Sequence, residues 1–254
     1  MKYNVITLLT KLEQDKDIKI MYACEAGSRA WGFPSPDSDY DIRFIYRHPR
    51  SWYLSLQEKK DTIEFMENEL LDGNGWDIRK VLRLLYKSNA SLYEWLFSPI
   101  VYIDGDQQLE ELRQLAGQYF QPKRVMHHYL GIARGMLDRE FKGPQVKIKK
   151  YFYVIRPVLA ARWIADQAAP PPVDFHDLLP LVKGQKDVYA NIQNLLAEKE
   201  HAAEGQLTDR IAALDNFIQK EMERLENVAK VMERQEYNYK GIDAFYRKYI
   251  LQLG

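Results

Sequence analysis

The sequence predicts an α+β fold: a small mixed sheet with helices, followed by an all-helical C-terminal domain. Runs typical of strands lie before residue 106, and from about residue 107 onward only helical patterns remain. A Gly-Ser pair at positions 27 and 28 and an Asp-Tyr-Asp triplet at 39–41 both fall in the strand-rich part. We therefore expect two domains, residues 1–106 and 107–254, with the chemistry in the first.

The first domain opens with a predicted helix over residues 4–15, where leucine and valine recur on one side. Apolar residues at 18–24 predict a strand, and a glycine- and proline-rich turn over 27–38 leads to a second strand at 40–46. The Gly-Ser pair thus lies between the two predicted strands, and the Asp-Tyr-Asp triplet lies at the start of the second strand.

Further short elements fill the rest of this domain. Residues 51–54 begin a short helix, 61–66 alternate like a strand, and 69–72 begin another. Gly73-Asn74-Gly75 indicates a hairpin turn or a loop before the next helix. An amphipathic pattern predicts that helix at 77–87, followed by a short helix at 92–97 and a short strand at 100–103.

The C-terminal domain carries four long helical patterns, at residues 122–140, 146–167, 187–203 and 207–234. The proline-rich stretch 168–173 cannot continue a helix, so we expect a linker there.

Composition indicates a globular protein without a global charge bias. Of its 254 residues 46% are apolar, and 36 Lys and Arg balance 36 Asp and Glu. Nucleic-acid binding would therefore need a local basic patch. One cysteine, Cys24, leaves no internal disulfide, and no apolar run reaches the length of a membrane span. We expect a cytoplasmic protein that does not bind membranes.

The two acids of the triplet are the strongest chemical signal. If residues 39–41 are strand, Asp39 and Asp41 point the same way, since strand side chains alternate. Their mutual repulsion would raise both pKa values, and a divalent cation between them would relieve it. Such oxygen ligands suit Mg²⁺. The alternative is that both acids are simply solvated at a strand edge.

Gly27 and Ser28 follow the first strand and predict a phosphate-binding turn. A glycine there lets backbone N–H groups approach a phosphate, and the Ser28 hydroxyl adds a donor. On its own, the glycine would more often mark only a turn. Together with the two acids, the pair indicates nucleotide chemistry.

Gly-Ser followed by Asp-x-Asp resembles the motif of the DNA polymerase β-like nucleotidyltransferase superfamily. The longer match, GSRAWGF at 27–33 and SDYDIR at 38–43, resembles a narrower group of bacterial and phage nucleotidyltransferases linked to RNA repair. The similarity continues at GWDIRK, residues 75–80, and at KKY, residues 149–151. It implies a polymerase β-like catalytic domain and a helical C-terminal lobe.

This resemblance implies a two-metal reaction with Mg²⁺, or alternatively Mn²⁺, held by Asp39, Asp41 and a third carboxylate. The sequence offers Glu64, Glu69, Asp72 and Asp77 for the third position. Asp77 ranks first because it lies in the GWDIRK match. Glu64 ranks second because it lies in mid-strand with apolar neighbours facing away.

The remaining expected contacts are to the triphosphate. Gly27 and Ser28 would hold the β- or γ-phosphate, and Arg29 or the basic cluster Lys147, Lys149 and Lys150 would neutralise its tail. The lysines could instead form a solvated helix face.

The sequence thus indicates an enzyme that moves a nucleoside monophosphate from a nucleoside triphosphate such as ATP to an acceptor hydroxyl, releasing pyrophosphate. An RNA end is the acceptor that the resemblance suggests. Nucleotidylation of a protein or a small molecule is the alternative, and an inactive module that binds a nucleotide or RNA is another.

Overall fold

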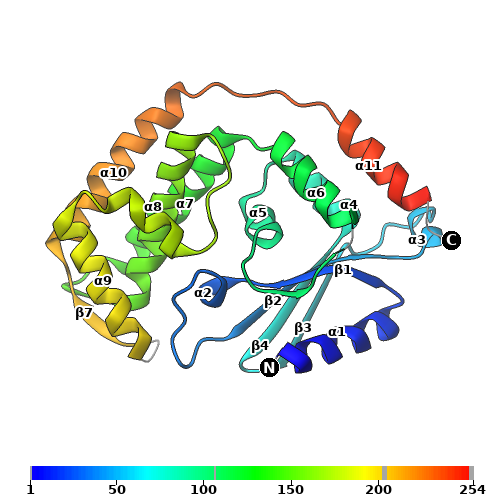
Figure 1. The fold of residues 1–254 in the computed structure, drawn as a ribbon, viewed down its shortest axis with the longest axis horizontal. Helices are drawn as coiled ribbons and strands as arrows, with labels where there is room; N and C mark the ends of the chain where they lie inside the picture. Colours follow the sequence, from blue (N-terminus) through cyan, green and yellow to red (C-terminus); the bar gives the residue numbers. More distant parts are fainter. Residues whose placement is uncertain (1, 106, 202–204, 252–254) are drawn as a thin grey trace. The chain divides into compact units, whose positions relative to one another are not determined.

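The computed structural model describes residues 2–105, 107–201 and 205–251. The chain forms two compact units that alternate along the sequence (Figure 1). The first contains residues 1–27, 39–120 and 236–254, and the second contains residues 28–38 and 121–235. The domain division at residue 106 stays a prediction.

The first unit is built on a five-stranded sheet. Its strands are β1 (Lys19–Glu25), β2 (Tyr40–Arg47), β3 (Thr62–Asn68), β4 (Leu71–Asp77) and β5 (Val101–Ile103). Their order across the sheet is β3-β4-β2-β1-β5. Only β2 and β4 pair in parallel within this sheet, and its other neighbours are antiparallel. The predicted small mixed sheet and α+β class are confirmed.

One face of this sheet is covered by α1 (Lys2–Lys16), as Figure 1 shows. Val5 and Leu9 of α1 are fully buried against Ile42 and Phe44 of β2. Alternation along β2 therefore turns Asp41 and Arg43 to the opposite face. The sheet face opposite α1 therefore carries the polar side chains of Asp41 and Arg43.

Helices complete the first unit. They are α3 (Arg50–Tyr53), α4 (Ile78–Tyr86), α5 (Ala90–Leu96), α6 (Gln107–Gln118) and α11 (Lys240–Leu251). The ring of Trp76 at the end of β4 stacks on Trp95 of α5, with centroids 3.6 Å apart. The Tyr22 hydroxyl of β1 donates to the Trp95 carbonyl at 2.8 Å. These contacts fix α5 on the face that carries Asp41.

The second unit is helical, with one short strand pair. Its elements are α7 (Pro122–Glu140), β6 (Gln145–Lys147), α8 (Ile148–Gln167), a 3₁₀ helix η1 (Phe175–Val182), α9 (Lys186–His201), β7 (Leu207–Asp209) and α10 (Ala212–Val231). The loop after α2 (Gly27–Ala30) packs into it, because Phe33 stacks on Phe152 with centroids 5.0 Å apart. Across the described ranges of both units, no helix is long and apolar enough to cross a membrane.

The structure corrects several sequence predictions. Gly73 and Gly75 lie within β4, and the chain turns before them, at Glu69 and Leu70. The pair β6–β7, the helix α11 and the 3₁₀ helix were not predicted. The helix predicted at 187–203 is confirmed as far as residue 201, and residues 202–203 lie outside the described part of the chain.

Gly75 lies in β4 for a steric reason. A Cβ built on Gly75 would lie 2.1 Å from the Phe44 ring, which is fully buried and cannot move aside. We predict that Gly75→Ala lowers the free energy of unfolding by about 1–3 kcal/mol, the usual cost of overpacking a core. Denaturant unfolding measures this value.

Gly131→Ala is the matched control, because a Cβ there, on α7, meets nothing within 4 Å. It should raise stability by roughly 0.5–1 kcal/mol. Equal effects of the two changes would contradict the steric explanation.

Candidate active site

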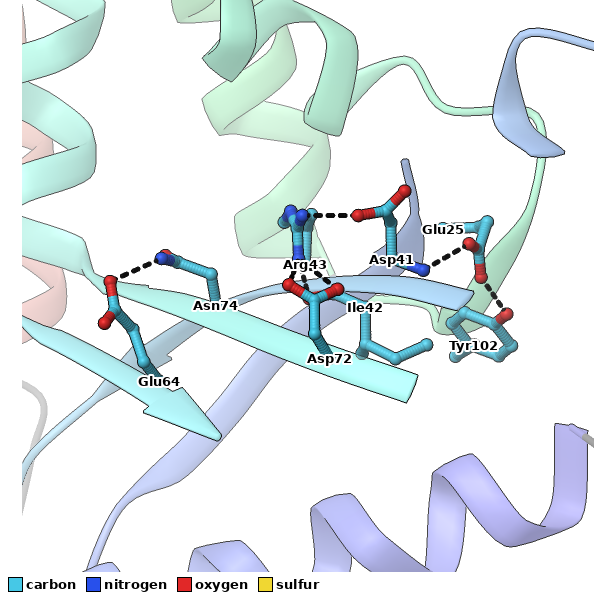
Figure 2. A network of polar contacts seen from close by, with 8 residues as sticks. All are labelled: Glu25, Asp41, Ile42, Arg43, Glu64, Asp72, Asn74 and Tyr102. Atoms are coloured by element: carbon cyan, nitrogen blue, oxygen red, sulfur yellow. Dashed lines mark hydrogen bonds and ion pairs between the residues drawn. The ribbon is translucent and has the colours of Figure 1, made fainter. Parts of the chain in front are cut away.

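The parallel pairing of β2 and β4 brings two carboxylates together. Asp41 and Asp72 are Cα partners in that register, so their side chains share one face. Arg43 lies with them (Figure 2): its Nη2 is 2.7 Å from Asp41 Oδ1, and its Nη1 is 3.4 Å from both Asp72 oxygens. One guanidinium therefore neutralises both acids.

The protonation of Asp41 reflects this crowding. Burial raises the pKa of Asp41, Arg43 opposes that rise, and the charges of Asp72 and Asp39 add to it. Several negative groups therefore act on one carboxylate. A divalent cation at this point would relieve their repulsion.

Asp39 departs from the sequence expectation. It precedes β2, which begins at Tyr40, and it is exposed. The alternation argument that placed it beside Asp41 on one strand face therefore does not hold. Its charge still acts on Asp41, so it lies close to this edge of the sheet.

Gly27 is in direct contact with Asp41. It has φ +61°, and a Cβ there would lie 2.0 Å from Asp41 Oδ2. The left-handed backbone and the close approach both require glycine. The turn that the sequence assigned to phosphate binding thus runs against the Asp41 carboxylate.

Sequence reasoning missed Glu25, which is 1% exposed at the end of β1. One of its oxygens accepts the Asp41 backbone N–H at 2.7 Å, and the other accepts the Tyr102 hydroxyl (Figure 2). Glu25 thereby fixes the backbone from which Asp41 projects. The available signal was a charged residue closing an otherwise apolar strand.

Ser28 and Arg29 belong to the second unit. The Ser28 hydroxyl donates to Ser38 Oγ at 3.1 Å, and Arg29 Nη2 donates to the Ser38 carbonyl at 2.7 Å. Ser38 Oγ also accepts the Ser35 backbone N–H, and the buried Lys199 donates to Ser35 Oγ at 2.7 Å. A hydrogen-bonded network thus shapes the loop from 28 to 38.

Of the three lysines in the predicted basic cluster, Lys149 and Lys150 lie half-buried in the first turn of α8, whereas Lys147 is exposed at the end of β6. Lys150 pairs with Glu140 at 2.8 Å and lies 5.9 Å from the centre of the Tyr153 ring. Lys150 therefore has a structural partner within the second unit.

Asp77 does not reach Asp41. In the parallel register Asp77 pairs with Tyr46, five positions along β4 from Asp72, which is about 16 Å at 3.3 Å per residue. It is fully buried and caps α4: its carboxylate accepts the Arg79 N–H and the Tyr53 hydroxyl, each at 2.8 Å. The expectation that Asp77 completes the metal site is therefore wrong on geometry.

The other candidate acids are also placed. Glu64 lies on β3 and accepts a hydrogen bond from Asn74 Nδ2 at 2.9 Å, so it stands one strand away from the carboxylate pair. Glu69 is exposed in the turn before β4. Asp72, which the sequence placed neither first nor second among the candidates, is the acid that the register sets beside Asp41.

These residues fit a divalent cation by donor chemistry. Asp41 and Asp72 offer hard carboxylate oxygens, and the pKa of Asp41 is raised first by burial and then by the charges of Asp72 and Asp39. Within the described ranges, no group of three or more His, Cys, Asp or Glu is already arranged to hold a metal ion. Arg43 lies against the two carboxylates that a cation would neutralise.

The family is shown by comparison with known proteins. Residues 1–248 match the model of the RNA repair pathway DNA polymerase beta family, RlaP, so the chain belongs to that family. This membership identifies it as a nucleotidyltransferase.

The chain is also similar to individual known proteins. YcgL of Bacillus subtilis (strain 168) is 43% identical over 236 residues, which span 93% of this chain and 91% of YcgL. Spectinomycin adenyltransferase AAD(9) from Enterococcus faecialis has 12% identity and a TM-score of 0.44, covering 90% of this chain and 98% of that one. A nucleotidyltransferase-like protein from Exiguobacterium sibiricum 255-15 has 11% identity and a TM-score of 0.32, with coverage of 98% and 79%.

Asp77 should control stability through its protonation. Burial raises its pKa to about 6, against hydrogen bonds from Tyr53 and Arg79 that lower it. Between about pH 4 and 6 the folded state then binds more protons than the unfolded state, so Asp77 makes the free energy of unfolding fall as pH rises. Asp77→Asn can still cap α4 but has no carboxyl group to ionise, so its free energy of unfolding does not fall in this pH range. It should therefore be more stable than the wild type by about 2 kcal/mol at pH 8.

The measurement is denaturant unfolding of both proteins from pH 4 to 8. The pKa of His48 is lowered to about 4, mainly by burial, which makes stability rise with pH over a similar range. The wild-type curve contains both effects, so only its difference from Asp77→Asn isolates Asp77. Parallel curves would contradict this role, and retained transfer activity in Asp77→Asn would confirm that Asp77 lies outside the site.

Gly27→Ala should impair catalysis more than folding. The added methyl strains a left-handed residue by about 1–2 kcal/mol and collides with Asp41. We expect transfer to fall at least about tenfold, because displacing a reacting group by 1 Å can cost 100-fold. Gly32→Ala is the matched control: Gly32 has φ +81°, but its Cβ would meet Asp174 and His176 instead. Equal losses of activity would refute a specific effect on Asp41.

Proposed function

We propose that this nucleotidyltransferase moves a nucleoside monophosphate from a nucleoside triphosphate, ATP being the expected donor, to the hydroxyl of an RNA end and releases pyrophosphate. The observation that carries the proposal is the pairing of Asp41 and Asp72 in one parallel register, with the Gly27 turn against Asp41. Membership of an RNA repair family supports RNA as the acceptor.

Asp41 and Asp72, with Asp39 nearby, are the residues that would hold Mg²⁺ or Mn²⁺. When bound, such ions neutralise charge that develops on the transferring phosphoryl oxygens and the leaving group. The chain's own task is then to fix these carboxylates. Glu25 does so for Asp41 by accepting the Asp41 backbone N–H with its carboxylate, and the parallel ladder does so for Asp72.

The nucleotide would be held by backbone and cationic groups. Gly27 has no side chain between its N–H and an incoming phosphate, and Ser28 adds a hydroxyl. Arg29, Lys149 and Lys150 are the proposed partners of the triphosphate charge. Of these, Lys150 would have to exchange Glu140 for phosphate.

Asp72 is the proposed acceptor of the proton from the attacking hydroxyl. Its side chain is 44% exposed, whereas that of Asp41 is 30% exposed, so it is the more accessible of the pair. A general base must lie within hydrogen-bond reach of the proton that it removes. The O–P bond to the acceptor forms as the bond to pyrophosphate breaks, and the proton passes to the Asp72 carboxylate.

We predict that Asp41→Asn and Asp72→Asn each lower transfer at least about 100-fold, the range expected for loss of general-base catalysis or of charge stabilisation. Both should fold, because the change removes repulsion between like charges. Glu69→Gln is the matched control, because Glu69 is an exposed acid in the turn before β4, and it should retain transfer. The assay supplies each labelled nucleoside triphosphate with Mg²⁺ or Mn²⁺ and with tRNA, nicked RNA or lysate protein.

The distribution of label decides the acceptor. Label in RNA supports the proposal, whereas label in protein or in a small molecule would reassign the acceptor. Nucleotide binding without any transfer would indicate an inactive binding module. Full activity of Asp72→Asn would remove Asp72 from the site.

A further inference from the structure

Three polar side chains form a row across the sheet. Arg43 of β2 is the Cα partner of Asn74 on β4, and Asn74 is the partner of Glu64 on β3. All three project from the face that carries Asp41 and Asp72 (Figure 2). Arg43 thus has acidic partners on one side and this amide on the other.

Asn74 has an unused acceptor. Its Nδ2 donates to Glu64 Oε1 at 2.9 Å, and its Oδ1 is buried with no hydrogen-bond partner among the described residues. A carboxylate can only accept, so Glu64 fixes the amide with its nitrogen outward and its oxygen free. Buried acceptors are rarely left without a donor. Asn74 Oδ1 therefore needs a hydrogen-bond donor that does not reach it in the present arrangement of side chains.

Arg43 is the donor that the register sets beside it. The guanidinium has five N–H groups, and they now serve Asp41, Asp72 and the Ile42 carbonyl. Asp72 and Asn74 are two positions apart on β4, about 7 Å along the strand. The end of one arginine side chain can cover that distance by changing rotamers.

We propose that Arg43 is a counter-ion with two positions: it neutralises Asp41 and Asp72 until a divalent cation binds them, and then donates to Asn74 Oδ1. This inference rests on the metal site of the proposed function. Arginine and a divalent cation cannot share the carboxylate pair, because two positive charges a few ångströms apart repel strongly. Asn74 gives the displaced guanidinium a neutral acceptor, and Glu64 supplies negative charge behind it.

Arg43 would therefore set the affinity of the site for cations. While Arg43 is paired with Asp41 and Asp72, it keeps the two carboxylates close together in the absence of a metal ion. It also competes with the divalent cation for them. The unused acceptor on Asn74 lowers that competition, because it stabilises the displaced position.

The test is a titration of the full chain with Mn²⁺, followed by calorimetry or by electron paramagnetic resonance of the free ion. Arg43→Met should bind Mn²⁺ about fivefold more tightly, since a partly exposed ion pair of this kind contributes up to about fivefold in an equilibrium constant. Asn74→Ala should bind about threefold more weakly, an effect smaller than loss of a full hydrogen bond. In the double variant the Asn74 change should have no effect, because the donor is gone.

Two further variants keep the result interpretable. Arg83→Met is the matched control: Arg83 is exposed on α4 and forms no ion pair in the part of the chain that the structure describes, so its loss should leave Mn²⁺ affinity unchanged. Arg43→Lys retains the charge without the planar fork, and should fall between the wild type and Arg43→Met. It also serves if Arg43→Met does not fold.

Failure of this inference can be separated from failure of the proposed function by Asp41→Asn. If the wild type binds no Mn²⁺, or Asp41→Asn binds it as well as the wild type does, the metal site itself is refuted. If Asp41→Asn abolishes binding but Arg43→Met and Arg43→Lys bind as weakly as the wild type or more weakly, only the counter-ion role is overturned. Additive effects of Arg43→Met and Asn74→Ala would likewise overturn the second position.

Discussion

The parallel pairing of β2 with β4 is the constraint on which the rest of the site depends. It sets Asp41 opposite Asp72 and, two positions further on, Arg43 opposite Asn74. Two acids on one sheet face repel each other, so the pairing needs a positive charge, which Arg43 supplies. The same register also carries Asp77 away to the far end of the strand. Strand geometry thus selects Asp41 and Asp72 as the proposed metal-binding acids.

Packing on the opposite face maintains this arrangement. Ile42 and Phe44 alternate with Asp41 and Arg43 along β2, and their burial beneath α1 prevents a shift of register by one residue. Gly75 gives the Phe44 ring its space, and Gly27 gives the Asp41 carboxylate its space. Glycines at these two points serve different ends: one completes the core, and the other allows a loop to approach a charged group.

Much of the fold was predictable because its signals are local. The periodicity of residues 77–87 predicted α4, and the apolar run before Gly27 predicted β1. The sequence ranked Asp77 first and could not show that Asp72 lies beside Asp41, because strand pairing is a non-local property. Gly73 and Gly75 resembled a turn because their steric reason, two aromatic rings from neighbouring strands, is also non-local. Glu25 was missed since a single acid closing a strand has no distinctive spacing.

The central claim is that Asp41 and Asp72 together form the metal site of this nucleotidyltransferase. Anomalous X-ray scattering from Mn²⁺ in crystals grown with a non-hydrolysable nucleoside triphosphate tests it most directly. We predict a peak within about 2.5 Å of carboxylate oxygens from both residues, as ions with oxygen ligands require, with the Arg43 guanidinium turned towards Asn74. A peak at Asp77, or one that Asp72 does not contact, would contradict the account.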